Sequence, residues 1–339
     1  MSMARFVSRH PLVTLGAAAG LWWLWPASSS PPPSPPPHAQ AAVLAEGFAA
    51  IDGANRIVEL DDAARRRREI AVTGAPSGGR VVGVADQIAL VWRDGKRIAL
   101  ALVDPDGSLG RTQKFGKRVA GLCEGVASNE HQFGVAWLEA DGSTWFVHGP
   151  TAARGGALAA EALVEQIAEP AADPAKSGSC AIASADDKLA LLISEGSRTT
   201  LTLCARQCGG ARRIELPKKS TVLGFGCTRG ACVVATRGAG GVVEATWVSA
   251  PQGRVEWTRP LPHASPDTRV SLAGTAAQVA IAYATSNEPV VVTASKAGAI
   301  ETVWQGPADE VPGLVHARGR LLVARHAGGE LAGSIVRVP

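Results

Sequence analysis

GVADQIALVW, residues 83–92, is a pair of short apolar segments joined by a polar turn, and related pairs recur five more times before the C-terminus. The spacing of about 45 residues is typical of an array of small repeated units rather than of unrelated domains. The second segment of each pair ends, in order, at Trp92, Trp137, Ile193, Thr236, Tyr283 and Arg325.

The first segment of each pair is rich in small residues, and a polar turn followed by a third apolar segment comes after most pairs. Trp257 and Trp304, in the fourth segments of two units, are separated by the same interval as Thr236 and Tyr283. The second and the fourth segments therefore repeat with the same period, which predicts that each unit contains four strands. The first segments are VVGVA from Val81, CEGVA from Cys123, CAIAS from Cys180, LGFGC from Leu223, SLAGT from Ser271 and GLVHA from Gly313.

A twisted four-stranded antiparallel sheet cannot bury both of its faces alone, whereas units of this length pack face to face around an axis as a β-propeller. Small residues belong on the innermost strand, where the units converge. We therefore predict an all-β protein with six four-stranded blades over residues 76–339. We expect a strand near residues 68–72 to complete the last blade by pairing with GSIVRV at the C-terminus. Seven blades is the alternative, because residues 46–60 could add two further strands.

The clearest copies, GVADQIALVW followed by ALVDPDG and GVASNEHQFGVAW followed by WFVHG, give the chain a resemblance to known proteins. In these repeats it resembles the exported β-propeller repeat proteins of bacterial envelopes. The resemblance covers residues 46–339 and is architectural. It implies a propeller fold but no particular activity, because propellers host both enzymes and binding modules.

Residues 1–27 predict an export segment or N-terminal membrane anchor. Arg5 and Arg9 precede an uncharged apolar run that ends in a tryptophan-rich stretch, so the rest of the chain is expected outside the cytoplasm. The run is short for a membrane span, and the sequence leaves cleavage or retention open. Residues 28–45 are a Pro/Ser/Ala-rich linker, interpreted either as a stiff tether or as a tail that is trimmed, and residues 46–339 form the propeller.

The charge balance argues against nucleic-acid binding. The net charge is +4, and two of the positive charges, Arg5 and Arg9, lie in the export segment. The remaining surface provides little of the clustered positive charge that nucleic acids require. The run Arg65–Arg68 is flanked by acidic residues, so a solvated hairpin turn is favoured over a docking patch or processing site.

Six cysteines in an exported chain predict structural disulfides. Two pairs are close along the chain, and the third occupies equivalent first-segment positions of adjacent units, so a bridge between blades is feasible. A four-thiolate zinc site is the alternative, but the cysteine spacings are not those of zinc knuckles. Six cysteines permit 15 pairings, and the sequence leaves the connectivity open. The candidate disulfide residues are Cys123, Cys180, Cys204, Cys208, Cys227 and Cys232.

Other residue types indicate no chemistry. The histidines are scattered, there is no nucleophile elbow or phosphate-binding loop, and the acidic residues Asp104, Asp106, Asp141, Asp186 and Asp187 lie in expected turns. We therefore assign no catalytic, cofactor-binding or metal residues and no cofactor. The long interval between Trp137 and Ile193 contains an insertion, residues 150–179, in which residues 163–167 could be either helical or the fourth strand of a blade. The histidines considered are His131, His148, His263, His316 and His326.

These observations favour a monomeric, non-catalytic, extracytoplasmic binding or scaffolding module that presents loops to a protein or glycan partner of the cell envelope. Contact with the membrane is expected only through the N-terminal segment. The alternative is an envelope hydrolase or lyase with an axial site assembled from several blades, which would leave no linear motif. Two or three buried, mutually close carboxylates or histidines near the axis would favour the enzyme.

Overall fold

The computed structural model describes residues 40–338, apart from short internal stretches. The predicted export segment, the linker up to residue 39 and most of the insertion at residues 150–179 lie outside the described residues. Within the described part of the chain, no helix has the length and apolar character needed to cross a membrane. The internal stretches are residues 45, 53–55, 75–78, 85–86, 126, 129–131, 151–162, 170–178, 186–187, 196–197, 205–207, 209–211, 217–219, 251 and 309.

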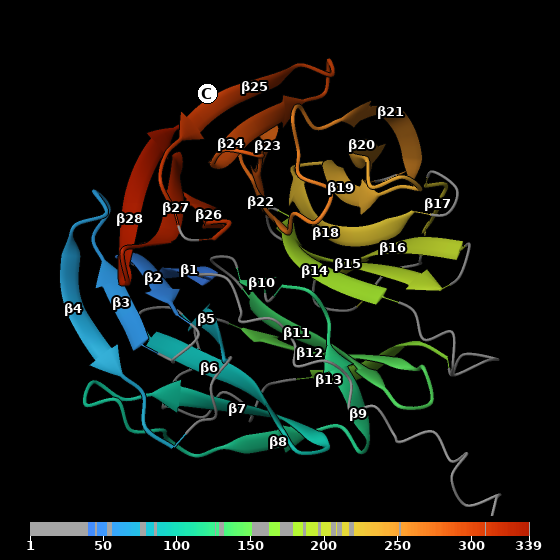
Figure 1. Ribbon diagram of the computed structural model, residues 1–339. Coiled ribbons are helices and arrows are strands. Elements are labelled where there is room, and N and C mark those ends of the chain that lie inside the picture. The colour runs from blue at the N-terminus through green and yellow to red at the C-terminus, as the bar shows by residue number, and fades with distance from the viewer. Residues whose placement is uncertain are drawn as a thin grey trace, which may run out of the picture. The chain divides into compact units, whose positions relative to one another are not determined.

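Seven antiparallel sheets surround a central axis in the described part of the chain, so the protein is a seven-bladed β-propeller (Figure 1). In every blade the chain runs from the axis outward. The innermost strands are β1 (Gln40–Leu44), β5 (Arg80–Val84), β9 (Val119–Leu122) with β10 (Ala127–Ser128), β14 (Ser179–Ala185), β18 (Thr221–Thr228), β22 (Val270–Gly274) and β26 (Gly313–Ala317).

The second and third strands form the main layers of each blade. The second strands are β2 (Gly47–Ile51), β6 (Gln87–Asp94), β11 (Gln132–Glu139), β15 (Lys188–Glu195), β19 (Ala231–Arg237), β23 (Gln278–Ala284) and β27 (Arg320–Ala327). The third strands are β3 (Arg56–Leu60), β7 (Arg97–Val103), β12 (Thr144–Pro150), β16 (Arg198–Cys204), β20 (Val243–Ser249), β24 (Pro289–Ser295) and β28 (Glu330–Arg337).

Outer strands complete six of the blades, whereas the last blade has three strands within the described residues. These outer strands are more exposed than the second strands, and each lies at the edge of its sheet, paired with one strand only. The outer strands are β4 (Arg66–Ala71), β8 (Gln113–Phe115), β13 (Leu163–Ala168), β17 (Arg212–Ile214), β21 (Arg254–Pro260) and β25 (Ile300–Gln305).

Apolar residues of facing blades form the cores. Between the fifth and sixth blades, for example, Trp247 and Tyr283 are almost completely buried among valine and alanine side chains. The Tyr283 hydroxyl donates a hydrogen bond to the Pro262 carbonyl oxygen at 2.9 Å, and burial raises the pKa of Tyr283 to about 12. Each core is thus shared by two blades, as expected for sheets that cannot bury both faces alone.

Glycine allows the innermost strands to approach one another. A Cβ atom placed on Gly83 would lie 1.7 Å from the Val43 carbonyl oxygen of the preceding blade, and one on Gly274 would lie 1.5 Å from that of Cys227. No real Cβ atom tolerates such a distance. The predicted crowding near the axis is therefore confirmed at these two positions.

The prediction of six blades is wrong and the alternative of seven blades is confirmed, whereas the predicted closure is wrong. Residues 40–71 form a complete first blade, whose inner strand β1 lies inside the stretch that had been assigned to the linker. Strand β4, expected to pair with the C-terminal strand, pairs instead with β3. The hairpin of β3 and β4 closes a short loop through a turn at residues 61–65, which costs little entropy compared with pairing across the whole chain.

Side chains close the ring between the last blade and the first. Arg318 donates hydrogen bonds to the carbonyl oxygens of Leu44 at 2.9 Å and Gly47 at 3.1 Å, and to Asp62 Oδ1 at 2.8 Å. A hydrophobic core that contains Phe48 of the first blade and Leu322 of the last blade also joins the two blades. Closure therefore rests on packing and arginine hydrogen bonds rather than on a shared sheet.

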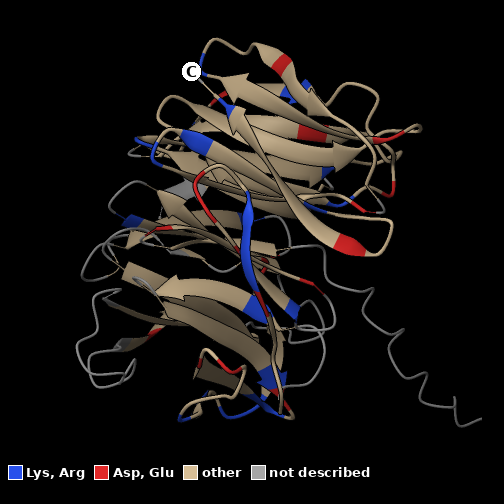
Figure 2. Cartoon of the chain, turned by 90° about the vertical axis from the view of Figure 1, so that its left-hand side faces the viewer, with Lys and Arg blue, Asp and Glu red and all other residues tan. Residues whose placement is uncertain are grey.

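The run Arg65–Arg68 is compensated, as predicted, although it enters an outer strand rather than forming only a turn. Each arginine lies within 4 Å of a carboxylate, from Asp61, Glu69, Glu46 or Glu59. Basic and acidic residues are interspersed on the side of the molecule in Figure 2. In the insertion, residues 163–168 form the outer strand β13, the strand alternative of the sequence interpretation.

Candidate functional site: the axial cavity

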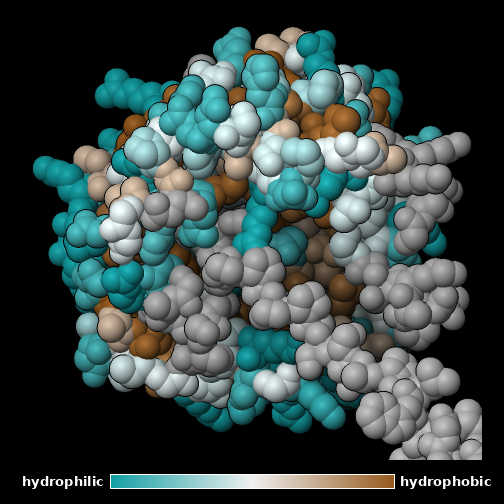
Figure 3. All heavy atoms as spheres, in the orientation of Figure 1, coloured by the Kyte–Doolittle hydropathy of each residue, from teal (hydrophilic) through white to brown (hydrophobic). Residues whose placement is uncertain are grey.

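A cavity of about 640 Å³ lies on the axis and is lined by the inner strands of all seven blades. Its volume falls in the range of sites for small ligands, roughly 300–1,000 Å³. Figure 3 shows apolar surface in the hollow at the middle of one face. The structural reason is geometric, because seven blades leave space at the centre that small inner-strand residues do not fill.

The walls are mostly alanine, glycine and branched aliphatic residues, with few polar side chains. The described lining residues include one acidic residue, Glu124, and one arginine, Arg229. They also include one histidine, His316, and one phenylalanine, Phe225. The other polar lining residues are Gln40, Ser184, Thr228, Ser271 and Thr275.

Glu124 reaches the cavity because the inner strand of the third blade is interrupted between β9 and β10. The Glu124 N–H donates to the Cys180 carbonyl oxygen at 2.8 Å, and the Ile182 N–H donates to the Glu124 carbonyl oxygen at 2.9 Å. These bonds fix the Glu124 backbone against the fourth blade. Its side chain remains 66% exposed.

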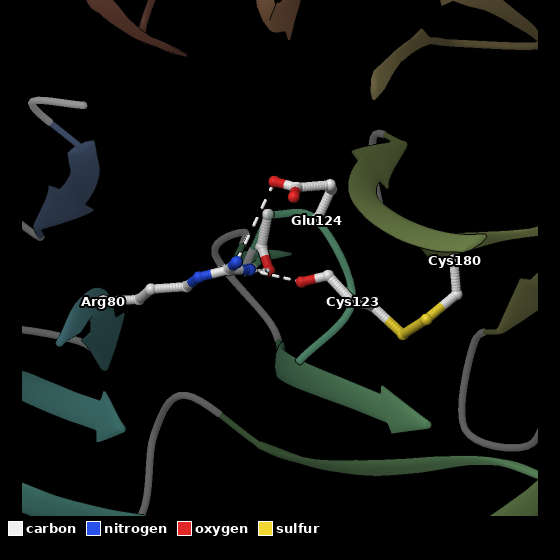
Figure 4. Close-up of a disulfide and its surroundings, with 5 residues drawn as sticks. Arg80, Cys123, Glu124 and Cys180 are labelled. Atoms are coloured by element: carbon white, nitrogen blue, oxygen red, sulfur yellow. Dashed lines mark hydrogen bonds and ion pairs between the residues drawn. A yellow bond between two sulfur atoms is a disulfide. The ribbon is translucent and has the colours of Figure 1, made fainter. Parts of the chain in front are cut away.

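Arg80 supports this loop from the second blade (Figure 4). Its guanidinium donates hydrogen bonds to the carbonyl oxygens of Cys123 and Gly125, and Nη2 lies 3.8 Å from the Glu124 carboxylate. Because the Arg80 side chain is only 16% exposed, burial lowers its pKa, and the nearby Glu124 carboxylate opposes that shift. Arg80 thus links the second blade to the wall residue of the third.

The cysteines form three disulfides, and the structure contains no free thiol. Cys123 and Cys180 join the third and fourth blades beside the cavity, with their Cα atoms 4.7 Å apart (Figure 4). The other two bridges lie within single blades. The predicted structural disulfides are confirmed, and the structure supplies the connectivity that the sequence leaves open. Three disulfides indicate an oxidising compartment.

His316 lies on β26 at the cavity wall, and burial lowers its pKa. The remaining described histidines do not join it. His148 stacks on Phe146 in the third blade, and His326 lies 3.9 Å from the buried Asp52 at the junction of the first and last blades. His131 is outside the described residues. In the described part of the chain, no cluster of three or more histidine, cysteine or acidic residues is suited to a metal ion.

The acidic residues of the turns have backbone roles, as predicted. Asp106 accepts hydrogen bonds from the Ser108 N–H and hydroxyl, and Asp141 accepts the equivalent bonds from Ser143. These hydrogen bonds lower the pKa of both carboxyl groups. Asp104 caps the same turn as Asp106, whereas Asp186 and Asp187 are outside the described residues.

Sequence reasoning did not identify Glu124, Arg229 and His316 as neighbours of one cavity. They come from three blades, so no spacing along the chain joins them. The sequence contains one local signal, the glycine that follows Glu124. In the structure this residue, Gly125, has a positive φ of 81° and lies at the break in the inner strand.

Comparison with known proteins supports the fold only. No family model matches the chain, and no curated protein matches its sequence. Among solved structures, it is similar to the lectin BP39L of Burkholderia pseudomallei, with a TM-score of 0.60, 15% identity and coverage of 88% of this chain and 96% of the lectin. It is also similar to the WD40 repeats of RRP9, with a TM-score of 0.60, 11% identity and coverage of 90% and 96%. It is similar, too, to the β-propeller domain of Cps50 (Swd1) from Myceliophteria thermophila, with a TM-score of 0.54, 16% identity and coverage of 87% of this chain and 94% of that domain.

Proposed function

We propose that this protein is a non-catalytic binding module that acts outside the cytoplasm and engages a protein or glycan partner of the cell envelope at one end of its axial cavity. The observation that carries the proposal is the cavity itself, which combines ligand-sized volume with mostly uncharged walls. A cavity of this kind favours recognition over chemistry, because ionisable side chains are few and dispersed over the blades.

The similarity to a lectin and to WD40-repeat proteins fits a binding scaffold at the level of fold. An enzyme would require converging acids, bases or nucleophiles. The described walls offer Glu124 and His316 on different blades, and Glu124 is largely exposed beside Arg80. No observation in the described cavity favours the hydrolase or lyase alternative over binding.

Two features support the proposed location outside the cytoplasm, the disulfides and the N-terminal sequence. An export segment followed by a proline-rich spacer suits a monomeric body held away from the membrane surface, either in the periplasm or anchored with the propeller outside. Cell fractionation tests this part, and a soluble cytosolic pool with six alkylatable cysteines would contradict it.

Site-specific photo-crosslinking tests partner binding. A photoreactive residue replaces Ala276, which is exposed in a turn at one mouth of the cavity, in the full-length protein expressed in its own host. The matched control carries the same residue at Thr258, which is exposed on the outer strand β21. We expect a defined envelope partner to crosslink from position 276 and not from position 258.

Equal crosslinking from both positions, or none from position 276, would contradict the proposal. So would turnover of an envelope polysaccharide or peptide by the purified protein that is lost in Glu124→Gln and His316→Gln. The second result would establish the enzyme alternative.

A further inference from the structure

Strand β28 is the outermost described strand of the last blade, whereas in the six other blades an outer strand covers the third strand (Figure 1). The burial of the two kinds of third strand differs accordingly. Six of the seven residues of β24 are buried, but only one of the eight residues of β28, Leu331, is buried. Ile335 and Val336 pack against the two neighbouring cores and are only partly buried. The described residues therefore leave apolar side chains of β28 partly exposed.

The other sheet edges at the rim are poorly suited to pairing with a further strand. Strands β8 and β17 have three residues each. The longer outer strands β4, β13, β21 and β25 each have an irregular register against the third strand of their blade. Short and irregular strands are common means of preventing pairing at a sheet edge. By contrast, β28 pairs with β27 along its whole length without irregularity.

The turn before β28 determines which of its main-chain groups face outward. Gly328 and Gly329 have positive φ values of 61° and 81°, as in a two-residue type I′ hairpin turn. The residues that flank such a turn form a hydrogen-bonded pair, so the next residue, Leu331, directs its N–H and C=O away from β27. Arg66 of the first blade donates to the Leu331 carbonyl oxygen at 3.4 Å, in agreement with this direction. By alternation, the other residues with outward main-chain groups are Gly333, Ile335 and Arg337.

The charge at the end of β28 favours an acidic neighbour. Arg337 is exposed and lies directly opposite Arg320 of β27. Like charges that face each other across a strand pair destabilise a sheet. Arg320 lies 3.5 Å from the Asp62 carboxylate, whereas the described residues place no carboxylate within 4.0 Å of Arg337. A strand that pairs with β28 and carries an acidic residue opposite Arg337 would compensate this charge.

A second copy of the chain cannot supply that acidic residue from its own β28. When two identical strands pair about a twofold axis, opposite residues point to the same face of the sheet, so their numbers differ by an even amount. Glu330, the acidic residue of β28, is an odd number of residues from Arg337. Residues 1–39 cannot supply it either, because they contain no Asp or Glu, and their prolines lack the N–H that strand pairing requires.

We propose that the outer edge of β28 binds an extended segment of a partner protein, which adds to the last blade as an antiparallel fourth strand. The segment carries an acidic residue opposite Arg337 and apolar residues opposite Val336 and Ile335. In strand addition, main-chain hydrogen bonds give affinity and the neighbouring side chains give specificity. This site lies at the rim of the propeller and does not depend on the axial cavity.

The test uses the full-length protein and an acetylated, amidated hexapeptide, Asp-Val-Val-Thr-Val-Thr, whose first residue is placed opposite Arg337. One N-methylated form blocks the N–H groups of the third and fifth residues, which point toward β28. A matched form blocks those of the second and fourth residues, which point away. In isothermal titration calorimetry, we expect the matched form to bind like the unmodified peptide. The first form should bind about tenfold or more weakly, because it loses two hydrogen bonds.

A charge reversal assigns the acidic position. Arg337→Glu should weaken binding of the hexapeptide by about three- to tenfold, and a peptide that begins with lysine should bind this variant better than the wild type. The matched control is Arg97→Glu, which alters an exposed arginine of β7 in the second blade. This control should bind both peptides like the wild type, and a thermal melt establishes that each variant is folded.

Hydrogen–deuterium exchange locates the bound peptide. In the free protein, we expect fast exchange at the outward amides of Gly333 and Ile335, and the hexapeptide should slow it. Slow exchange at these amides in the free protein would overturn the inference. In a monomer it would show that another segment of the chain covers β28, and in a dimer, identified by sedimentation, that a second copy does.

The inference would also be overturned if the unmodified hexapeptide did not bind, or if the two N-methylated forms bound equally. None of these outcomes bears on the axial cavity, whose function is tested separately by crosslinking from position 276.

Discussion

At the scale of single residues, the close packing of inner strands near the axis requires glycine at particular positions. Gly83 and Gly274 stand where carbonyl oxygens of the preceding blade occupy the position of a Cβ atom. The sequence predicts small residues in these strands because the same crowding recurs in each unit. It does not predict which of the small residues are irreplaceable, since that depends on the register between neighbouring blades.

Gly274→Ala should destabilise the protein by about 1–3 kcal/mol, because the new methyl group forces the inner strands of the fifth and sixth blades apart. Gly121→Ala is the control, since a Cβ atom at that position meets nothing within 4 Å. Chemical denaturation of both variants measures the difference. Equal losses would show that the close approach is not a constraint.

His316 gives the fold a dependence on pH. Burial lowers its pKa below the ordinary value of 6.5, so the unfolded chain binds a proton more readily than the folded protein. The free energy of unfolding should therefore fall as the pH decreases below about 6.5 toward the lower pKa of the folded state. Relative to His316→Gln, the wild type should lose stability between pH 7.5 and pH 5.5 in urea titrations.

The exposed His263 provides the control for this measurement. His263→Gln should keep the pH dependence of the wild type. A wild-type curve parallel to that of His316→Gln would show that the histidine is not desolvated in solution.

At the scale of elements, the predicted strand order within the repeats is largely confirmed. Inner, second and third strands of six blades follow the apolar segments found in the sequence, and the outer strands at Trp257 and Trp304 are present. The first blade entered the prediction only through the seven-bladed alternative, in which residues 46–60 add two strands; its inner strand β1, QAAVL, was missed because it is only five residues long, lacks glycine and directly follows the proline-rich stretch. A short apolar segment at such a boundary has no periodicity of its own.

The bridge between blades should contribute more stability than the bridges within them. Cys123 and Cys180 are separated by 57 residues, whereas Cys204 and Cys208 are separated by 4. In the chain-entropy model, the longer loop adds about 2 kcal/mol more to the free energy of unfolding. We expect the double serine variant of the first pair to melt well below that of the second, as measured by calorimetry, and equal melting would contradict this.

At the scale of the whole molecule, the ring is closed by contacts between residues that are far apart in the sequence. Arg318 and its acceptors Leu44, Gly47 and Asp62 could not be paired from the sequence, because the position of the first blade was unknown. The charges of the cavity were missed for the same reason. The repeats predict the strand order within each blade, whereas the cavity residues depend on contacts between different blades.

Arg318→Leu should loosen this junction while leaving the other blades intact, because it removes three hydrogen bonds from one place. Hydrogen–deuterium exchange should accelerate in β1, β2, β26 and β27 and remain unchanged in β15 and β16. Arg337→Leu, at an exposed position of the last blade, is the control. Uniform acceleration, or none, would show that closure does not depend on Arg318.

The position of the disulfide between blades has a mechanical consequence. The two ends of the described chain belong to the first and last blades, so a force applied between them separates these blades before it reaches the third and fourth. The 57-residue segment between Cys123 and Cys180 then stays out of the stretched contour while the bond is intact. In single-molecule pulling, reductant should lengthen the fully extended chain by about 200 Å, and unchanged length would contradict the covalent link between blades.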